Sequence, residues 1–393
     1  GLSVFGLLLN PIVGSLSDEY GRRPAMIASI SVSCISSLVF LHTIQSPTMN
    51  PAWYYLVESF AGGFQYLGLL FATLSDIVPE QHRAASFGLL IGSLYGGLAA
   101  APSIALWLDH SQTALVCAVL ATLSLAAAVL VFPETLKSNS SHPCENAEAD
   151  GEQSARFSST LSVVCKPFRE MSILNRNWTI RLVTLGGFIS SMVFASDRAL
   201  VLYYAEDHFD FGDKDIATMF LIVGITGFSL QVLALNPLVQ CMGEKHLLVL
   251  TFLCGSIHNL LYGVARSKTG IFVAVVLSQL TKVNVPVLAS IASKSVKESE
   301  QGRMQGALTA FGSLGTAAGP LSMELIYSQT KDRRGFGPGF MFIYAAGLYA
   351  VGTFLVYLIP TRTAQEPNRT EELPGLSERG DLEEPLLAEN TDD

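Results

Sequence analysis

The chain has 393 residues, of which half are hydrophobic and only 15% are charged, and its mean hydropathy is +0.41. That much apolar material exceeds what one soluble core absorbs, which disfavours a soluble globular domain and favours a protein that lies in a membrane. The net charge of −9 comes largely from the loops and ends, where 143–153 and 371–393 are acidic, and neither stretch indicates a nucleic-acid surface.

Long apolar segments recur along the chain. A helix that crosses a bilayer needs about 20 apolar residues, because lipid offers no hydrogen-bond partner for backbone N–H and C=O groups. The sequence predicts one short and ten full segments, at 1–14, 25–43, 53–76, 84–106, 112–132, 178–203, 216–240, 246–265, 270–291, 304–327 and 338–359. The predicted fold class is therefore an all-α polytopic membrane protein.

Between the first two apolar segments lies a short polar loop with the sequence Gly14-Ser-Leu16-Ser-Asp18-Glu-Tyr-Gly21-Arg22-Arg23-Pro24. Gly14 and Gly21 allow two helices to approach closely and the chain to reverse tightly. Asp18 and Arg22 are four residues apart, a spacing at which their side chains can pair.

This loop resembles the G-x-L-[SA]-D-x-x-G-R-[RK] signature that joins the second and third transmembrane helices of the major facilitator superfamily. The resemblance implies two pseudo-symmetric six-helix bundles, in which Asp18 docks on the repeat-related helix of the other bundle. It also implies that Arg22 links to an acid that ends the fourth helix, here Asp76. The predicted gating residues are Gly14, Asp18, Gly21, Arg22, Arg23 and Asp76. The alternative interpretation is a loop that only satisfies helix ends.

Several polar residues lie within the apolar segments, where ionisable groups are costly unless they face a bundle interior or a water-filled cavity. The candidates for a substrate or ion pathway are Glu58, Gln65, Asp197, Arg198, Gln231, Gln279, Lys282 and Asn284. We expect Asp197 or Arg198 to pair with Lys282 or Glu58, although structural ion pairing or snorkelling remains the alternative. The neutral groups could bond either a solute or a neighbouring helix. His258 is interpreted as packing, because one imidazole makes neither a metal site nor a proton relay by itself.

An internal repeat relates the two halves of the chain. Glu80-Gln81-x-Arg83 recurs as Glu300-Gln301-x-Arg303 (300 − 80 = 220), and Asn10-Pro11 recurs as Asn236-Pro237 (236 − 10 = 226). After the second match, Gly243-Glu244-Lys245 stands where the first copy has Gly21-Arg22-Arg23. Parallel repeats about an axis along the membrane normal build this transporter fold.

The repeat also indicates a missing first helix. Asn236 lies 58 residues beyond 178 (236 − 178 = 58), whereas Asn10 has only 9 residues before it. The difference of about 50 residues corresponds to one helix and the start of the next. We therefore expect a twelve-helix parent without its first helix, so that eleven segments are present; a natural eleven-helix protein is the alternative.

The expected organisation is a truncated N-terminal transmembrane bundle at 1–132, a cytoplasmic central loop at 133–177, a C-terminal bundle at 178–360 and a disordered cytoplasmic tail at 361–393. Basic residues are more frequent in loops on the side of Asp18, so the positive-inside rule places both ends of the complete protein in the cytoplasm. The glycosylation sequons at Asn139, Asn177 and Asn368 then lie in the cytoplasm and are expected to be unused.

Two further segments have their own interpretations. The stretch 160–176 alternates apolar and basic residues, which predicts either an interfacial helix or a solvated loop. The tail sequence Glu383-Glu384-Pro385-Leu386-Leu387 resembles an acidic dileucine signal, although Leu382 stands at the usual acidic position, and a sorting adaptor is its expected partner.

The chain is also similar to the hippocampus-abundant-transcript and tetracycline-exporter branch of the superfamily. The residues that carry this resemblance are Ser75-Asp76-Ile77-x-x-Glu80-Gln81-His82-Arg83-Ala84, Val285-Pro286-Val287-x-Ala289 and Glu300-Gln301-Gly302-x-x-Gln305-Gly306. The resemblance implies a solute carrier and leaves the solute, the direction and the membrane, plasma membrane or endomembrane, undefined.

We therefore predict a secondary transporter of a small organic solute that works by alternating access, with proton coupling left open. The alternative is a receptor or scaffold that has the transporter fold and does not transport. An enzyme is not expected, because the sequence has no H-E-x-x-H, no G-x-S-x-G and no P-loop. The partners expected are the lipid bilayer, the solute and protons, with no cofactor, metal or nucleic acid.

Overall fold

All regular secondary structure in the described part of the chain is helical. The computed structural model describes residues 2–46, 48–105, 107–136, 169–331, 333 and 337–360. Helices satisfy their backbone hydrogen bonds within one segment except at their ends, which is what long apolar sequences need when no water is available.

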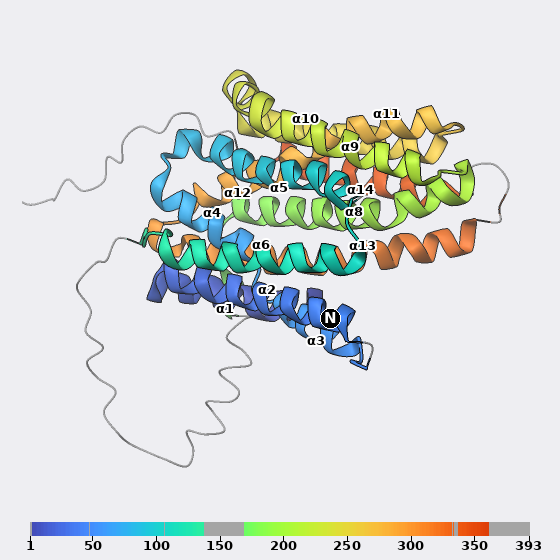
Figure 1. Ribbon diagram of the computed structural model, residues 1–393. Helices are drawn as coiled ribbons and strands as arrows, with labels where there is room; N and C mark the ends of the chain where they lie inside the picture. The colour runs from blue at the N-terminus through green and yellow to red at the C-terminus, as the bar shows by residue number, and fades with distance from the viewer. Residues whose placement is uncertain are drawn as a thin grey trace, which may run out of the picture. The chain divides into compact units, whose positions relative to one another are not determined.

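The first half of the chain forms a group of helices that Figure 1 shows in blue to teal. They are α1 (Leu2–Tyr20), α2 (Arg22–Gln45), α3 (Ala52–Ala61), α4 (Tyr66–Ile77), the 3₁₀ turn Glu80–His82, α5 (Arg83–Ala105) and α6 (His110–Leu130).

The second half is coloured green to red in Figure 1. It consists of the 3₁₀ turn Met171–Asn175, α8 (Trp178–Phe209), α9 (Asp213–Ser229), the π-turn Leu230–Ala234, α10 (Leu235–Val264), α11 (Lys268–Ser278), the 3₁₀ turn Gln279–Val283, α12 (Asn284–Ser293), the 3₁₀ turn Glu298–Glu300, α13 (Gln301–Thr330) and α14 (Phe340–Tyr357).

Two of the segments predicted as continuous helices are interrupted near their middles. The segment 53–76 divides into α3 and α4 around a turn at residues 62–65, where the carbonyl side-chain oxygen of Asn10 accepts a hydrogen bond from the Gln65 N–H at 3.2 Å. The segment 270–291 divides into α11 and α12 around the 3₁₀ turn Gln279–Val283. The two interruptions lie at an offset close to that of the repeat (279 − 62 = 217), so both halves break the corresponding helix at the same depth.

The loop glycines of the two halves share an unusual backbone conformation. Gly21 has φ 105° and Gly243 has φ 74°, and among the described residues these are the glycines in the left-handed region. Side chains other than hydrogen are strained there, which explains glycine at both positions. At Gly243 the reversal lies inside α10, so the expected segments 216–240 and 246–265 join through a kink.

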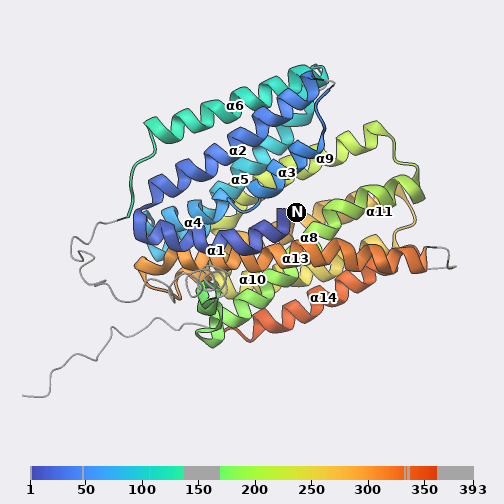
Figure 2. The same ribbon diagram turned by 90° about the horizontal axis from the view of Figure 1, so that it is seen from below.

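Two lines of packing join the halves. Helix α1 lies along α13 and helix α5 lies along α9, as Figure 2 shows from below. The larger hydrophobic core lies in the second half, around side chains such as Phe252, Phe342 and Tyr349, whereas a smaller cluster surrounds Phe71 and Phe87. Residues Gly1–Ile359 form one compact unit, and the division into two bundles stays a prediction.

Seven helices in the described ranges are long and apolar enough to cross a membrane. They are Arg22–Gln45, Glu80–Ala101, His110–Leu130, Trp178–Phe209, Lys214–Val264, Lys268–Ser293 and Phe340–Tyr357. The predicted segments 1–14, 53–76 and 304–327 are helical but are not among them, and Lys214–Val264 combines two predicted segments. The remaining predicted segments coincide with one helix of this set each.

Some expectations fall wholly or partly outside the described residues. They concern Asn139, Asn368, the tail 361–393 with its dileucine sequence, and most of the central loop. Of the stretch 160–176, residues from 169 onward are described, and they form a 3₁₀ turn in which Ile173 and Leu174 are buried. Asn177 caps α8, because its side-chain oxygen accepts a hydrogen bond from the Ile180 N–H at 2.8 Å.

Candidate functional site

The carboxylate of Asp18 bridges the two halves of the chain. Its Oδ1 accepts a hydrogen bond from the Gly302 N–H at 2.7 Å, and its Oδ2 accepts one from the Arg303 N–H at 2.6 Å. Both donors belong to the first turn of α13, where N–H groups have no partner within the helix and the helix dipole favours an anion. A side chain at the end of α1 therefore caps a helix of the other half.

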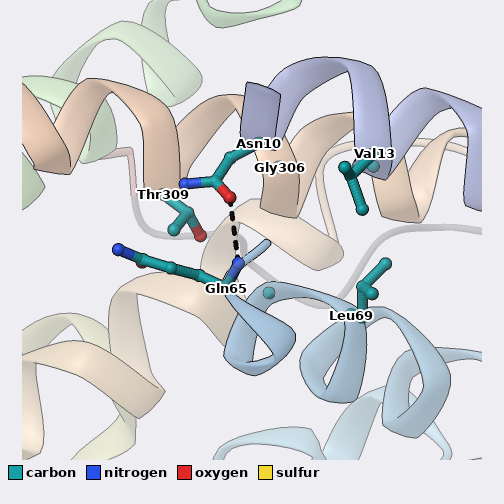
Figure 3. A pocket seen from close by; sticks show the side chains of 8 residues that line it. Asn10, Val13, Gln65, Leu69, Gly306 and Thr309 are labelled. Atoms are coloured by element: carbon teal, nitrogen blue, oxygen red, sulfur yellow. Dashed lines mark hydrogen bonds between the residues drawn. The ribbon is translucent and has the colours of Figure 1, made fainter. Parts of the chain in front are cut away.

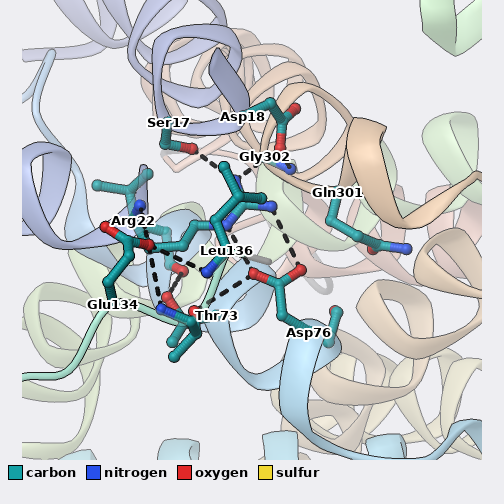
Figure 4. A network of polar contacts seen from close by, with 12 residues as sticks. Ser17, Asp18, Arg22, Thr73, Asp76, Glu134, Leu136, Gln301 and Gly302 are labelled. Carbon is teal, nitrogen blue, oxygen red and sulfur yellow. Dashed lines mark hydrogen bonds and ion pairs between the residues drawn. The ribbon is translucent and has the colours of Figure 1, made fainter. Parts of the chain in front are cut away.

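Arg22 holds this contact together from the first half (Figure 4). Its guanidinium pairs with Asp18 at 2.6 Å through Nη1 and with Asp76 at 2.8 Å through Nε, while Nη1 also donates to the Ser17 hydroxyl at 2.7 Å. The Arg22 side chain is fully buried, so its charge is compensated by these partners rather than by water. Arg22, Asp18 and Asp76 thus form one connected network.

The expected helix for the docking of Asp18 was wrong in one respect. By the repeat, Asn10 in α1 corresponds to Asn236 in α10, so α10 contains the counterpart of α1. Asp18 instead caps α13, whose repeat counterpart is α5. The physical reason is that a carboxylate needs free N–H donors, and only the first turn of a helix offers them.

Glu134 is a second capping carboxylate at the same end, and the sequence analysis did not assign it to the site. It follows α6, and its oxygens accept hydrogen bonds from the N–H groups of Arg22 at 2.8 Å and Arg23 at 3.1 Å, the first turn of α2. It also accepts from Thr135 at 3.1 Å and Leu136 at 3.0 Å. Partial burial raises the pKa of the Glu134 carboxyl, but the four backbone hydrogen bonds together bring that pKa below its ordinary value of 4.5.

We expect the change Glu134→Ala to lower the free energy of unfolding by about 0.5–1 kcal/mol, the lower part of the range for helix caps because the side chain is exposed. Because the pKa of Glu134 is lowered in the folded protein, this contribution is present above pH 4.5 and is lost as the pH falls through the folded-state pKa. The measurement is the melting midpoint in detergent against pH. Glu80→Ala, at an exposed position, is the control; equal pH profiles for the two variants would contradict the assignment.

Small residues let α1 and α13 touch. A methyl group added at Gly14 would collide with the carbonyl oxygen of Gly302 and approach Gly306, and one added at Gly306 would collide with the carbonyl oxygen of Asn10. The glycine spacing on the two helices therefore brings backbone against backbone beside the Asp18 contact.

The second half carries a corresponding ion pair with the charges exchanged. Glu244 follows Gly243 as Arg22 follows Gly21, and it pairs with Lys294 at 2.8 Å at the end of α12. Arg22 pairs with Asp76 at the end of α4. The offsets, 244 − 22 = 222 and 294 − 76 = 218, follow the repeat.

Lys282 lies in the interrupted helix of the second half. Its ammonium lies 4.0 Å from the centre of the Phe194 ring, and no carboxylate of the described residues lies within 4.0 Å of it. The Gln231 side chain donates a hydrogen bond to the Lys282 carbonyl at 3.0 Å, so the π-turn and the 3₁₀ turn are tied together here. Irregular turns inside helices often lie at functional sites.

The expected pairing of Asp197 or Arg198 with Lys282 or Glu58 was wrong. Asp197 Oδ2 instead lies 3.1 Å from His258 Nε2, and the Glu58 carboxylate accepts a hydrogen bond from Ser36. His258, interpreted from sequence as packing, is fully buried and takes part in a polar contact. The contact between Asp197 and His258 could not be predicted from the sequence pattern, because the two residues are 61 positions apart on different helices.

The remaining neutral candidates make mostly structural contacts. Asn284 accepts from Thr251 at 2.5 Å and donates to Ser190 at 3.3 Å, which links three helices of the second half. Gln279 donates to the Val275 carbonyl of its own helix at 3.0 Å.

Gln65 lines a cavity of about 10 Å³ between the halves, shown in Figure 3 with Asn10 and Thr309 around it. The side-chain nitrogen of Asn10 is buried there without a hydrogen-bond partner in the described part of the chain. A cavity of that size holds about one water molecule, which would satisfy this group.

Comparisons with known proteins agree with this geometry. The family model of the Major Facilitator Superfamily matches residues 1–234 and 183–388. The chain is 22% identical to hippocampus abundant transcript-like protein 1 of Bos taurus over 378 residues, which covers 91% of this chain and 72% of that protein. It is 25% identical to the class G tetracycline resistance protein of Vibrio anguillarum, over 89% of this chain and 84% of that protein.

Among solved structures, that of the human organic anion transporter MFSD10 (TETRAN) matches with a TM-score of 0.75 and 21% identity, over 90% of this chain and 82% of that chain. The loop, the bridging carboxylate and the repeat are thus found in a chain whose sequence and fold both match one family of transporters. The chain belongs to the Major Facilitator Superfamily, whose members are membrane transporters and not enzymes.

Proposed function

We propose that the chain is a secondary active transporter that moves a small organic solute by alternating access, as 1–132 rocks against 178–360. The observation that carries this is the capping of α13 by Asp18, because it is a polar contact between halves that either forms or is replaced by water. Such a contact makes a bistable gate of the kind that alternating access requires. The loop charges support a cytoplasmic position for this gate and for both ends of the complete protein.

The solute we propose is an organic anion. Lys282 has an aromatic partner at 4.0 Å among the described residues, and the charges that act on it are those of Asp197 and of the exposed Arg198. Two cations and one carboxylate therefore share the middle of the second half, which leaves excess positive charge there. A structurally similar transporter carries organic anions according to its title, which supports the same class. The same proposal includes coupling of the transport to protons and binding of a sorting adaptor to the C-terminal tail.

The experiment is uptake of a radiolabelled panel of organic anions, cations and neutral metabolites into proteoliposomes that contain the full chain. We expect an anion to be taken up. We expect Asp18→Asn to slow its uptake about tenfold, because the loss of one charge-assisted hydrogen bond destabilises the closed state by about 1.5–3 kcal/mol. Glu19→Gln is the matched control, since Glu19 is exposed beside Asp18.

Two results would count against the proposal. If no member of the panel crosses the membrane, the receptor or scaffold interpretation is favoured. If Asp18→Asn and Glu19→Gln behave alike, the gate lies elsewhere.

A further inference from the structure

We propose that a cavity at the end of α8 binds an organic carboxylate, at a site separate from Lys282. The cavity has a volume of about 340 Å³ and lies between the end of α8, the end of α10 and the start of α14. That volume is at the lower end of the range for small-molecule sites. The inference goes beyond the proposed function, because a site within one half of the chain can bind its ligand without any rocking of the halves.

The cavity lies far from the polar network at the start of α13. Helix α8 begins beside that network, where Arg176 donates to Glu300 at 2.6 Å, and its 32 residues carry the chain about 48 Å away to Phe209. Three helices that are long and apolar enough to cross a membrane end or begin at the cavity, at Phe209, Val264 and Phe340. The cavity therefore lies where apolar spans meet water.

The walls of the cavity are held in place by packing within the second half. The Tyr204 ring lies edge-on to His208 and Phe209, with ring centres 4.9 Å and 5.6 Å apart. The backbones of α10 and α14 touch beside these rings, because a methyl group added at Gly339 would collide with the Gly263 carbonyl oxygen. A preformed wall has little freedom to lose when a ligand binds.

Two polar groups of the lining have no partner in the described part of the chain. Tyr204 is only 4% exposed, and its hydroxyl forms no hydrogen bond with any described residue, although buried phenol groups usually have a partner. Arg266 is exposed, and its guanidinium pairs with no carboxylate among the described residues. The cavity thus has a hydroxyl and a cation available to a ligand.

These groups select a ligand with one negative charge and an apolar body. The two oxygens of a carboxylate can accept hydrogen bonds from the Arg266 guanidinium and from the Tyr204 hydroxyl. Among the described lining residues, Arg266 is the one that is always charged, and His208 already lies 3.5 Å from the Asp207 carboxylate. An anion of higher charge would therefore lack a second cation, whereas Phe209 offers its ring to an apolar body.

Calorimetric titration of the purified full chain in detergent micelles with sodium benzoate tests the site, with benzamide as the uncharged analogue. We expect saturable binding of benzoate and none of benzamide. Arg266→Gln should weaken the binding about tenfold or more, and Tyr204→Phe about threefold or more, because each removes a hydrogen bond to a charged group. Lys214→Gln is the control, since Lys214 is exposed and does not line the cavity.

A further variant separates this site from the proposed transport path. Lys282→Gln should bind benzoate as the wild type does, because Lys282 does not line the cavity. If Lys282→Gln abolishes the binding and Arg266→Gln does not, or if the wild type binds no benzoate, the carboxylate site is wrong. The titration involves no transport, so a failure of the uptake panel overturns the proposed function and leaves this site standing.

The carboxylate could come from water or, as a free fatty acid, from the bilayer. The titration is therefore repeated in nanodiscs prepared with oleate, with methyl oleate or with neither. Loss of benzoate binding with oleate alone supports the site and assigns its ligand to the bilayer, and unchanged binding supports a ligand from water. Equal loss with methyl oleate would show that the negative charge is not recognised, which overturns the proposal.

Discussion

The change Arg22→Gln should lower the free energy of unfolding by about 3–5 kcal/mol, the range for a buried ion pair that loses one partner. The Arg22 guanidinium is fully buried and lies within 2.8 Å of the carboxylates of Asp18 and Asp76. Without it, two carboxylates would remain at this site with no cation between them. The measurement is chemical unfolding of the full chain in mixed detergent micelles, followed by helical circular dichroism.

A matched control lies at the next residue. Arg23 is exposed, and among the described residues its guanidinium donates only to the Val129 carbonyl at 2.7 Å, so Arg23→Gln should cost about 0.5 kcal/mol or less. The double change of Arg22→Gln with Asp76→Asn should be less destabilising than the single change, because it removes one of the unpaired charges. Equal losses for the two arginine variants would show that the network does not stabilise the fold.

The change Gly14→Ala should open the gate rather than unfold the protein. Its methyl group would collide with the Gly302 carbonyl oxygen in the closed arrangement of α1 and α13. Overpacking of this kind costs about 1–3 kcal/mol, and a cost confined to the closed state shifts its population about 5-fold to 150-fold. Distances between spin labels on Gln81 and Lys297, which are exposed on the two halves, should lengthen on average.

The control for this change is Gly97→Ala, because a methyl group at Gly97 meets no atom within 4 Å. That variant should keep the distance distribution of the wild type and its melting midpoint. If Gly14→Ala keeps the wild-type distances, the contact between α1 and α13 is not part of the gate, and the distances would then be carried by other contacts between the halves.

The sequence predicted the helices and the loop well, because length, hydropathy and the glycine positions are local properties. The resemblance of the loop to the superfamily signature implied an acid at the end of the fourth helix, and the pair of Arg22 with Asp76 at 2.8 Å agrees with that implication. The break between α3 and α4 was not predicted; at this turn the side chain of Asn10, from another helix, accepts a hydrogen bond from the Gln65 N–H.

The contacts between distant residues were harder to predict. Gly302 lies in a stretch that resembles the related transporters, but its contact with Asp18 was not predicted. That contact is made by its backbone N–H group, which no side-chain pattern reveals. Glu134 belonged to an apparent linker, and the partners of Asp197 and His258 depend on how α8 meets α10. Polar pairs across helices arise from tertiary packing, which one sequence does not show.

The reversed polarity of the two corresponding ion pairs constrains how the halves could have diverged from a common ancestor. Arg22 with Asp76 and Glu244 with Lys294 occupy matching places, so one half exchanged both signs. A single replacement that reversed the sign of one member would have placed like charges together at the end of a helix. The exchange therefore had to pass through an uncharged residue or through two coupled substitutions, and a chimaera that joins the loop of one half to the helix end of the other should inherit the same conflict.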